Sequence, residues 1–195
     1  MYLIISLNFF QLNYNFNINF VFLLINFIFI LFFYFDKKNI HFFLISSLIN
    51  ILIFSFFYLV ETNNVYFIFL IIALVSINDV MGYLIGRRIG KTKIFPKISP
   101  NKSLEGTFAG IIFTIFVSIY YAHFFNFDYF SYFLLGLLIS LIGLLGDLYV
   151  SLFKRKLNIK DISNIIPGHG GFLDRFDSYL FCMPSSIIML KTFLE

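Results

Sequence analysis

Aspartates stand at the ends of long apolar runs, next to segments that are rich in lysine and arginine. Asp147 follows the uncharged run 129–146, and Asp174 and Asp177 stand three residues apart before the next apolar run. Residues three apart share a face of a helix. Carboxylates gathered in this way bind hard cations through oxygen. The helix dipole also favours carboxylates at a helix N-terminus, which explains Asp177 equally well but does not explain Asp147.

The segment between these aspartates is basic and contains the run Pro167-Gly168-His169-Gly170-Gly171. A histidine next to carboxylates is a candidate metal ligand. However, a cluster that is otherwise carboxylate suits magnesium better than zinc. We therefore expect His169 to contact phosphate or to make a structural hydrogen bond.

An earlier segment has a similar mixture of one carboxylate, glycines and cations. Asp79 stands near the end of an apolar run, and Gly86 and Gly90 lie among arginines and lysines. The sequence Ser99-Pro100-Asn101 is typical of a turn. Glycine with lysine and serine suits phosphate groups, because backbone N–H and ammonium groups both favour anions. The spacing is not that of a P-loop, so this segment alone indicates function only weakly.

The elements that must position these residues are membrane helices. Of the 195 residues, 60% are hydrophobic and 12% charged, whereas soluble domains carry roughly 25% charged residues. Runs of about 20 apolar residues cross a bilayer, and there the backbone must be helical. We predict an all-α, polytopic integral membrane helical bundle with two functional cytoplasmic loops. Its six expected spans are about Ile18–Phe35, Ile40–Val60, Val65–Ile85, Thr107–Phe125, Tyr129–Tyr149 and Ser178–Leu194.

Lysine and arginine gather in the connections after the first, third and fifth expected spans. The opposite connections hold Glu61 and Asp128 and no lysine or arginine. The positive-inside rule therefore makes the basic connections cytoplasmic and places both termini outside. Orientation and attraction to anionic lipid would by themselves explain such loops. We treat the chain as a single membrane domain, 1–195, with a divergent hydrophobic part (1–77), a part carrying the motifs (78–178) and a last helix (179–195).

Together the two polar segments resemble the phosphatidate cytidylyltransferase family, the integral membrane CDP-diacylglycerol synthases. The earlier segment is similar to the family through Asp79, Tyr83, Gly86, Arg87, Gly90, Pro96, Ser99-Pro100, Lys102-Ser103 and Glu105-Gly106. The later one follows the family's C-terminal signature in order through Ser151, Lys154-Arg155, Lys160-Asp161, Pro167 to Gly171, Asp174-Arg175 and Asp177. The resemblance covers roughly residues 78–178, about half of the chain.

The resemblance implies transfer of CMP from CTP to phosphatidate, giving CDP-diacylglycerol and pyrophosphate in phospholipid biosynthesis. It implies Mg²⁺ held by Asp147 and Asp174, and it leaves open a second, monovalent or divalent, cation. Lys154, Arg155, His169 and Arg175 would complete the catalytic set. Substrate-binding roles would fall to Asp79, Ser99, Lys102, Glu105, Lys160, Asp161, Gly170, Gly171 and Asp177. The expected partners are CTP, phosphatidate and a bacterial plasma membrane or organelle bilayer, without nucleic acid; a homodimer is left open.

Two features depart from the family pattern and keep alternatives open. Val150 stands where the family usually has glutamate, and the chain is shorter than most relatives. A related enzyme could use CTP with another lipid phosphate, and a decayed relative would be inactive. A small transporter or channel would place Asp79 and Asp147 on an ion path, but the acids gather at helix ends beside basic loops instead.

Overall fold

The computed structural model describes residues 40–61, 64–96, 98–156 and 176–194. The chain divides into two compact units, Met1–Phe54 and Ser55–Glu195. Helix α3 (Ile40–Glu61) crosses from one unit to the other and corresponds to the second expected span. The first expected span, Ile18–Phe35, lies outside the described residues. The second unit contains every described residue of the candidate site.

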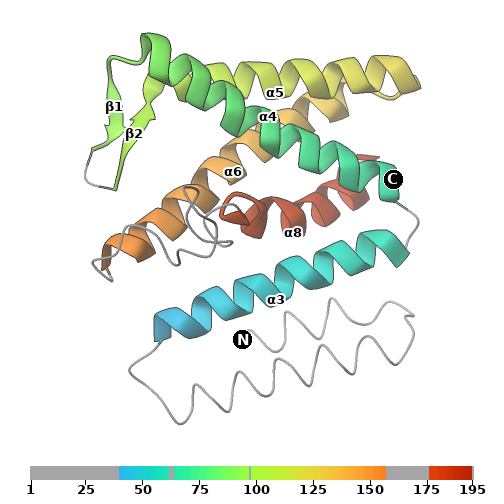
Figure 1. The fold of residues 1–195 in the computed structure, drawn as a ribbon. Helices are drawn as coiled ribbons and strands as arrows, with labels where there is room; N and C mark the ends of the chain where they lie inside the picture. The colour runs from blue at the N-terminus through green and yellow to red at the C-terminus, as the bar shows by residue number, and fades with distance from the viewer. Residues whose placement is uncertain (1–39, 62–63, 97, 157–175, 195) are drawn as a thin grey trace. The chain divides into compact units, whose positions relative to one another are not determined.

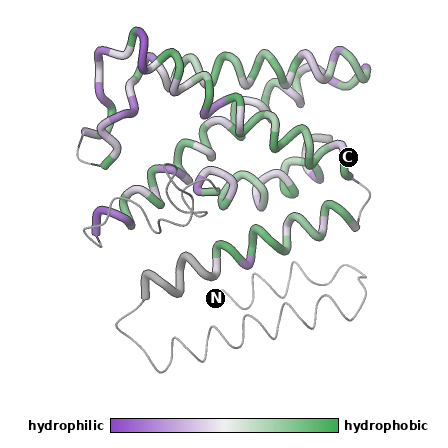
Figure 2. The backbone as a smooth tube through the Cα atoms, viewed as in Figure 1, coloured by the Kyte–Doolittle hydropathy of each residue, from purple (hydrophilic) through white to green (hydrophobic). Residues whose placement is uncertain are grey.

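Three helices of the second unit are each long and apolar enough to cross a membrane: α4 (Val65–Ile89), α5 (Leu104–Phe125) and α6 (Tyr129–Lys156). They confirm the all-α fold class, and they correspond to the third, fourth and fifth expected spans. Figure 2 shows hydrophobic residues along all three and hydrophilic residues at the C-terminal end of α6. Both α4 and α6 run several residues beyond their predicted ends, into Arg87–Arg88 and Lys154–Lys156. Cations in a last turn interact favourably with the helix dipole, so the basic residues continue these helices.

The last expected span, Ser178–Leu194, is helical but changes geometry along its length. Helix α8 (Tyr179–Met189) continues into a π-helical turn, η2 (Leu190–Leu194). Pro184 lies inside α8 and has no backbone N–H to donate. The hydroxyl groups of Ser185 and Ser186 donate hydrogen bonds to carbonyl oxygens of the same helix, 2.6 Å and 2.7 Å away. The serines therefore bind backbone acceptors within the apolar helix.

A two-stranded antiparallel hairpin joins α4 to α5 and was not predicted (Figure 1). Its strands are β1 (Lys93–Phe95) and β2 (Ser99–Ser103). The prediction of a turn at Ser99-Pro100-Asn101 is wrong, because these residues begin β2. The turn falls just before them, where the N–H of Ile98 donates to the carbonyl of Phe95 over 3.1 Å. Proline is tolerated at a sheet edge, and both strands of a two-stranded hairpin are edges.

Helices α4 and α5 approach each other through glycines. A Cβ on Gly106 of α5 would lie only 2.8 Å from the Cα of Gly86 on α4. Small residues at helix contacts allow backbones to pack closely in a membrane, where lipid removes the hydrophobic drive to associate. This contact holds the N-terminal end of α5, and with it the hairpin, against the C-terminal part of α4.

Replacing Gly106 by alanine should therefore destabilise the protein. We expect the free energy of unfolding to fall by about 1–3 kcal/mol, the usual cost of overpacking. Gly82→Ala is the matched control, because its new Cβ would meet the Gly106 carbonyl at an ordinary 3.5 Å. Denaturant unfolding of the purified variants in detergent micelles compares the two. Equal stability of both variants would show that the close α4–α5 approach is not required.

Candidate active site

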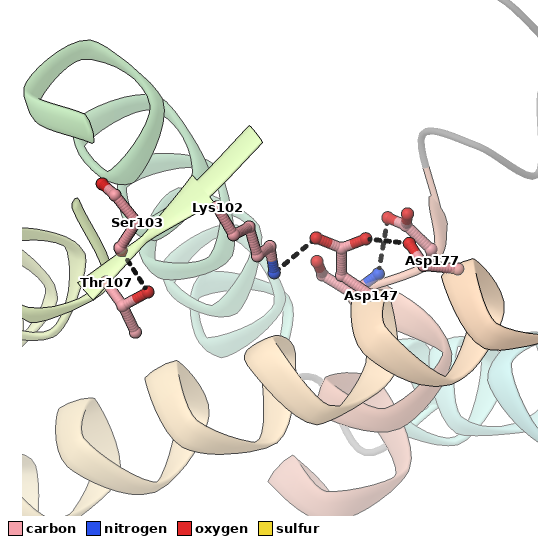
Figure 3. Close-up of polar contacts among 7 residues, drawn as sticks. Lys102, Ser103, Thr107, Asp147 and Asp177 are labelled. Carbon is pink, nitrogen blue, oxygen red and sulfur yellow. Dashed lines mark hydrogen bonds and ion pairs between the residues drawn. The ribbon is translucent and has the colours of Figure 1, made fainter. Parts of the chain in front are cut away.

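The two polar segments of the sequence meet at Asp147. The carboxylate of Asp147, on α6, forms an ion pair with the ammonium group of Lys102, on β2 (Figure 3). Both side chains are 23% exposed, so the pair is partly shielded from solvent. Shielding strengthens the attraction between opposite charges compared with a pair in water. This ion pair therefore links the hairpin to the C-terminal half of α6.

The carboxyl group of Asp177 lies on another side of Asp147 and is hydrogen-bonded to it (Figure 3). Ser151 donates to Asp147 Oδ1 over 3.2 Å, and the N–H of Ser178 donates to Asp177 Oδ1 over 2.9 Å. A hydrogen bond between two carboxyl groups requires a proton on one of them. Burial, together with the negative charge of Asp147, raises the pKa of Asp177 to about 7. Asp177 therefore holds a proton at pH values where an ordinary aspartate is ionised.

Asp79 joins this cluster from α4. Its carboxylate accepts a hydrogen bond from the Ser178 side chain and interacts electrostatically with Lys102 and Asp147. Helix α4, helix α6 and the chain entering α8 thus each contribute one aspartate around one lysine. Carboxyl groups outnumber cations in this cluster, which favours the binding of a further cation.

The donor chemistry of the cluster fits Mg²⁺, because hard cations prefer carboxylate oxygens. Asp147, one of the two predicted metal ligands, belongs to this cluster. The other predicted ligand, Asp174, lies outside the described residues. Among the residues that the structure describes, no three His, Cys, Asp or Glu side chains are arranged to hold one metal ion.

Two of the predicted site residues hold the hairpin in place. The Glu105 carboxylate accepts hydrogen bonds from the N–H and the hydroxyl group of Thr92, at 3.2 Å and 2.8 Å. The guanidinium Nε of Arg155 donates to the carbonyl of Ile98 over 3.2 Å. Ser103 caps α5 by accepting from the N–H of Gly106 over 3.2 Å. These contacts anchor the hairpin, whose strand β2 carries Lys102, to α5 and α6.

The remaining predicted residues are placed only in part. Ser99 begins β2, and Lys154 lies in the last turn of α6. Val150, where the family usually has glutamate, is fully buried in α6. Lys160, Asp161, His169, Gly170, Gly171 and Arg175, like Asp174, fall outside the described residues.

Sequence reasoning missed Thr92, Ser178 and Gly146 as residues of this region. Ser178 had a recognisable signal, since serine commonly stands where a helix begins. Thr92 had none, because its partner Glu105 follows 13 residues later and only the hairpin brings them together. Gly146 packs directly against the backbone of Asp177.

The fold and the site define a helical membrane protein with an acidic cluster where α4, α6 and the chain entering α8 meet Lys102 of a basic hairpin. The sequence profile of the cytidylyltransferase family matches residues 1–193. The chain belongs to this family. The match extends well beyond residues 78–178, to which the recognisable motifs are confined.

Curated relatives from staphylococci are named phosphatidate cytidylyltransferase. The proteins of Staphylococcus haemolyticus (strain JCSC1435) and Staphylococcus aureus (strain COL) are each 37% identical over 131 residues, covering 66% of this chain and 50% of the relative. The Staphylococcus epidermidis protein is 38% identical over 122 residues, covering 61% of this chain and 47% of the relative. The chain spans about half the length of the curated relatives it matches.

Proposed function

We propose that this membrane protein is a phosphatidate cytidylyltransferase, which transfers CMP from CTP to phosphatidate and releases pyrophosphate. The observation that carries the proposal is the Lys102–Asp147 ion pair. It joins the two segments that resemble the family, and it puts a cation suited to phosphate beside a carboxylate suited to a metal ion. The family membership and the names of the staphylococcal relatives support the same reaction.

The reaction brings several negative charges together. A phosphate oxygen of phosphatidate attacks the α-phosphorus of CTP, the bond to the β-phosphate oxygen breaks, and pyrophosphate leaves with the electron pair. The attacking oxygen is already ionised near neutral pH, so a strong general base is not needed. Catalysis of such transfers consists mainly of positioning the groups and neutralising their charge. A cluster of fixed cations and carboxylates is suited to this task.

Each described residue then has a role that follows from its charge and place. Asp147 would hold Mg²⁺ together with Asp174, and the bound ion would neutralise phosphate charge and align attacking and leaving groups. Lys102 would contact phosphate oxygens from the hairpin side. Lys154 and Arg155, at the end of α6, would add positive charge around the nucleotide. Asp79 and Asp177 would orient Lys102 and Asp147.

The position of the cluster suits one lipid and one water-soluble substrate. Phosphatidate keeps its acyl chains in the bilayer and its phosphate at the surface, where the ends of α4 and α6 meet the hairpin. CTP arrives from water. The positive-inside rule makes this the cytoplasmic face, and the bacterial relatives favour a plasma membrane.

The direct test is conversion of labelled CTP by the purified protein in lipid micelles, with Mg²⁺ and after its removal by a chelator. Phosphatidate and an isoprenoid phosphate are supplied in separate reactions. We expect Mg²⁺-dependent formation of CDP-diacylglycerol from phosphatidate. Product from the isoprenoid phosphate alone would assign a different lipid substrate. Absence of product from folded protein with either lipid would overturn the proposal.

A further inference from the structure

Gly146 lies directly before Asp147 and is buried where α6 meets the chain entering α8. A Cβ at this position would lie 2.7 Å from the carbonyl oxygen of Asp177 and 3.3 Å from the Cα of Ser178. Both are backbone atoms, so they cannot rotate away as the end of a side chain can. Any side chain at residue 146 would therefore push this part of the backbone away from α6.

The segment that would move carries the Asp177 carboxyl group. This carboxyl is hydrogen-bonded to Asp147 and is held in turn by the N–H of Ser178 over 2.9 Å. Its contact with Asp147 thus depends on how closely the backbone of residues 177–178 approaches α6. Of the three glycines on α6, Gly146 is the one whose added Cβ would meet the backbone of residues 177–178.

Gly143 provides the comparison, because it lies one turn earlier on α6 and also faces α8. A Cβ on Gly143 would meet the sulfur of Cys182 at 3.3 Å and side-chain atoms of Asn78 and Ser178 at 3.7 Å and 3.8 Å. These neighbours are all side-chain atoms, and only the sulfur is close. Packing between α6 and α8 as such therefore tolerates a methyl group at 143 better than at 146.

We propose that Gly146 is a positioning residue for the candidate active site: the absence of a side chain lets the Asp177 carboxyl reach Asp147 and so sets the affinity of Asp147 for a divalent cation. The inference rests on the proposed function in treating Asp147 as a metal ligand. Groups that orient a metal ligand typically change metal affinity by about 10–100-fold when they are altered. A shift of the Asp177 segment should have an effect of this size.

The test is Mn²⁺ binding to the purified protein without nucleotide or lipid substrate, followed by electron paramagnetic resonance of the free ion. We expect Gly146→Ala to weaken binding about tenfold or more, with Gly143→Ala close to wild type. In turnover assays, the Mg²⁺ concentration for half-maximal rate should rise for Gly146→Ala, while the KM for phosphatidate stays unchanged. Equal Mn²⁺ affinity of both alanine variants, or no Mn²⁺ binding by the wild type, would overturn the inference.

A second variant covers the case in which Gly146→Ala does not fold. Asp177→Ala removes the carboxyl group that hydrogen-bonds to Asp147 and leaves Gly146 unchanged, and it should also weaken Mn²⁺ binding; wild-type affinity would contradict the proposed role of the Asp147–Asp177 contact. The two proposals fail separately. Gly146-dependent Mn²⁺ binding without CDP-diacylglycerol synthesis would refute the reaction, whereas synthesis with an unchanged Mn²⁺ affinity in Gly146→Ala would refute the positioning role.

Discussion

Asp147→Asn should nearly abolish CDP-diacylglycerol synthesis while leaving the protein folded. Asparagine has the size of aspartate, so it can still accept the hydrogen bond from Ser151 and still meet Asp177. It loses the negative charge that attracts both Lys102 and a divalent cation. Removing one preorganised electrostatic group at a reacting centre typically costs about 10²–10³-fold in kcat. We expect at least this loss at saturating CTP and phosphatidate.

Asp128→Asn is the matched control for this variant. Asp128 lies at the turn between α5 and α6, where its carboxylate accepts a hydrogen bond from the N–H of Ser131 over 2.7 Å. The same change of charge there should leave turnover close to wild type. Turnover of labelled CTP and thermal unfolding in micelles are measured for both variants. Full activity of Asp147→Asn would remove Asp147 from the metal site, and a similar loss in both variants would indicate a general effect of net charge.

The membrane helices could be predicted because their signal lies in the length of each apolar run. Helices α4, α5 and α6 follow from runs long enough to cross a bilayer, since an unpaired backbone is not tolerated there. The C-terminal ends of α4 and α6 were placed too early, and the N-terminal end of α5 was placed at Thr107 although the helix begins at Leu104. The basic residues that mark a cytoplasmic loop also stabilise a helix end, so α6 continues to Lys156. Composition alone does not separate these two roles.

The hairpin could not be predicted because its causes are distant in the sequence. Ser99-Pro100-Asn101 has local turn propensity, but the hairpin as a whole is held by the Thr92–Glu105 and Ile98–Arg155 hydrogen bonds. Such tertiary contacts override local preference. In the candidate site, too, the sequence indicated the residues but not their contacts. The residue types at Asp79, Lys102, Asp147 and Asp177 indicated their chemistry, whereas the pairing of Lys102 with Asp147 depends on the packing of α4, α5 and α6.

The ion pair also makes Lys102 the most informative cation to change. Lys102→Met keeps most of the side-chain length and removes the charge, so Asp147 loses its partner and phosphate loses a contact. A hydrogen bond to a charged group contributes about 1.5–3 kcal/mol, which corresponds to a loss of roughly 10–150-fold in kcat/KM for CTP. Lys102→Arg keeps the positive charge and should retain more activity than Lys102→Met.

Lys93→Met tests whether the effect belongs to Lys102 or to the charge of the hairpin as a whole. Lys93 is exposed on β1, and its Cα is paired in register with Ser103, next to Lys102 in the chain. This variant removes the same charge from the same hairpin without touching Asp147. Because exposed charges are screened by salt, we expect its effect to be small and to fade at high ionic strength. The loss in Lys102→Met should persist in salt, since the Lys102–Asp147 pair is partly shielded. Equal losses that both disappear in salt would mean that the hairpin attracts CTP only through its overall charge, and that Lys102 does not contact the reacting phosphates.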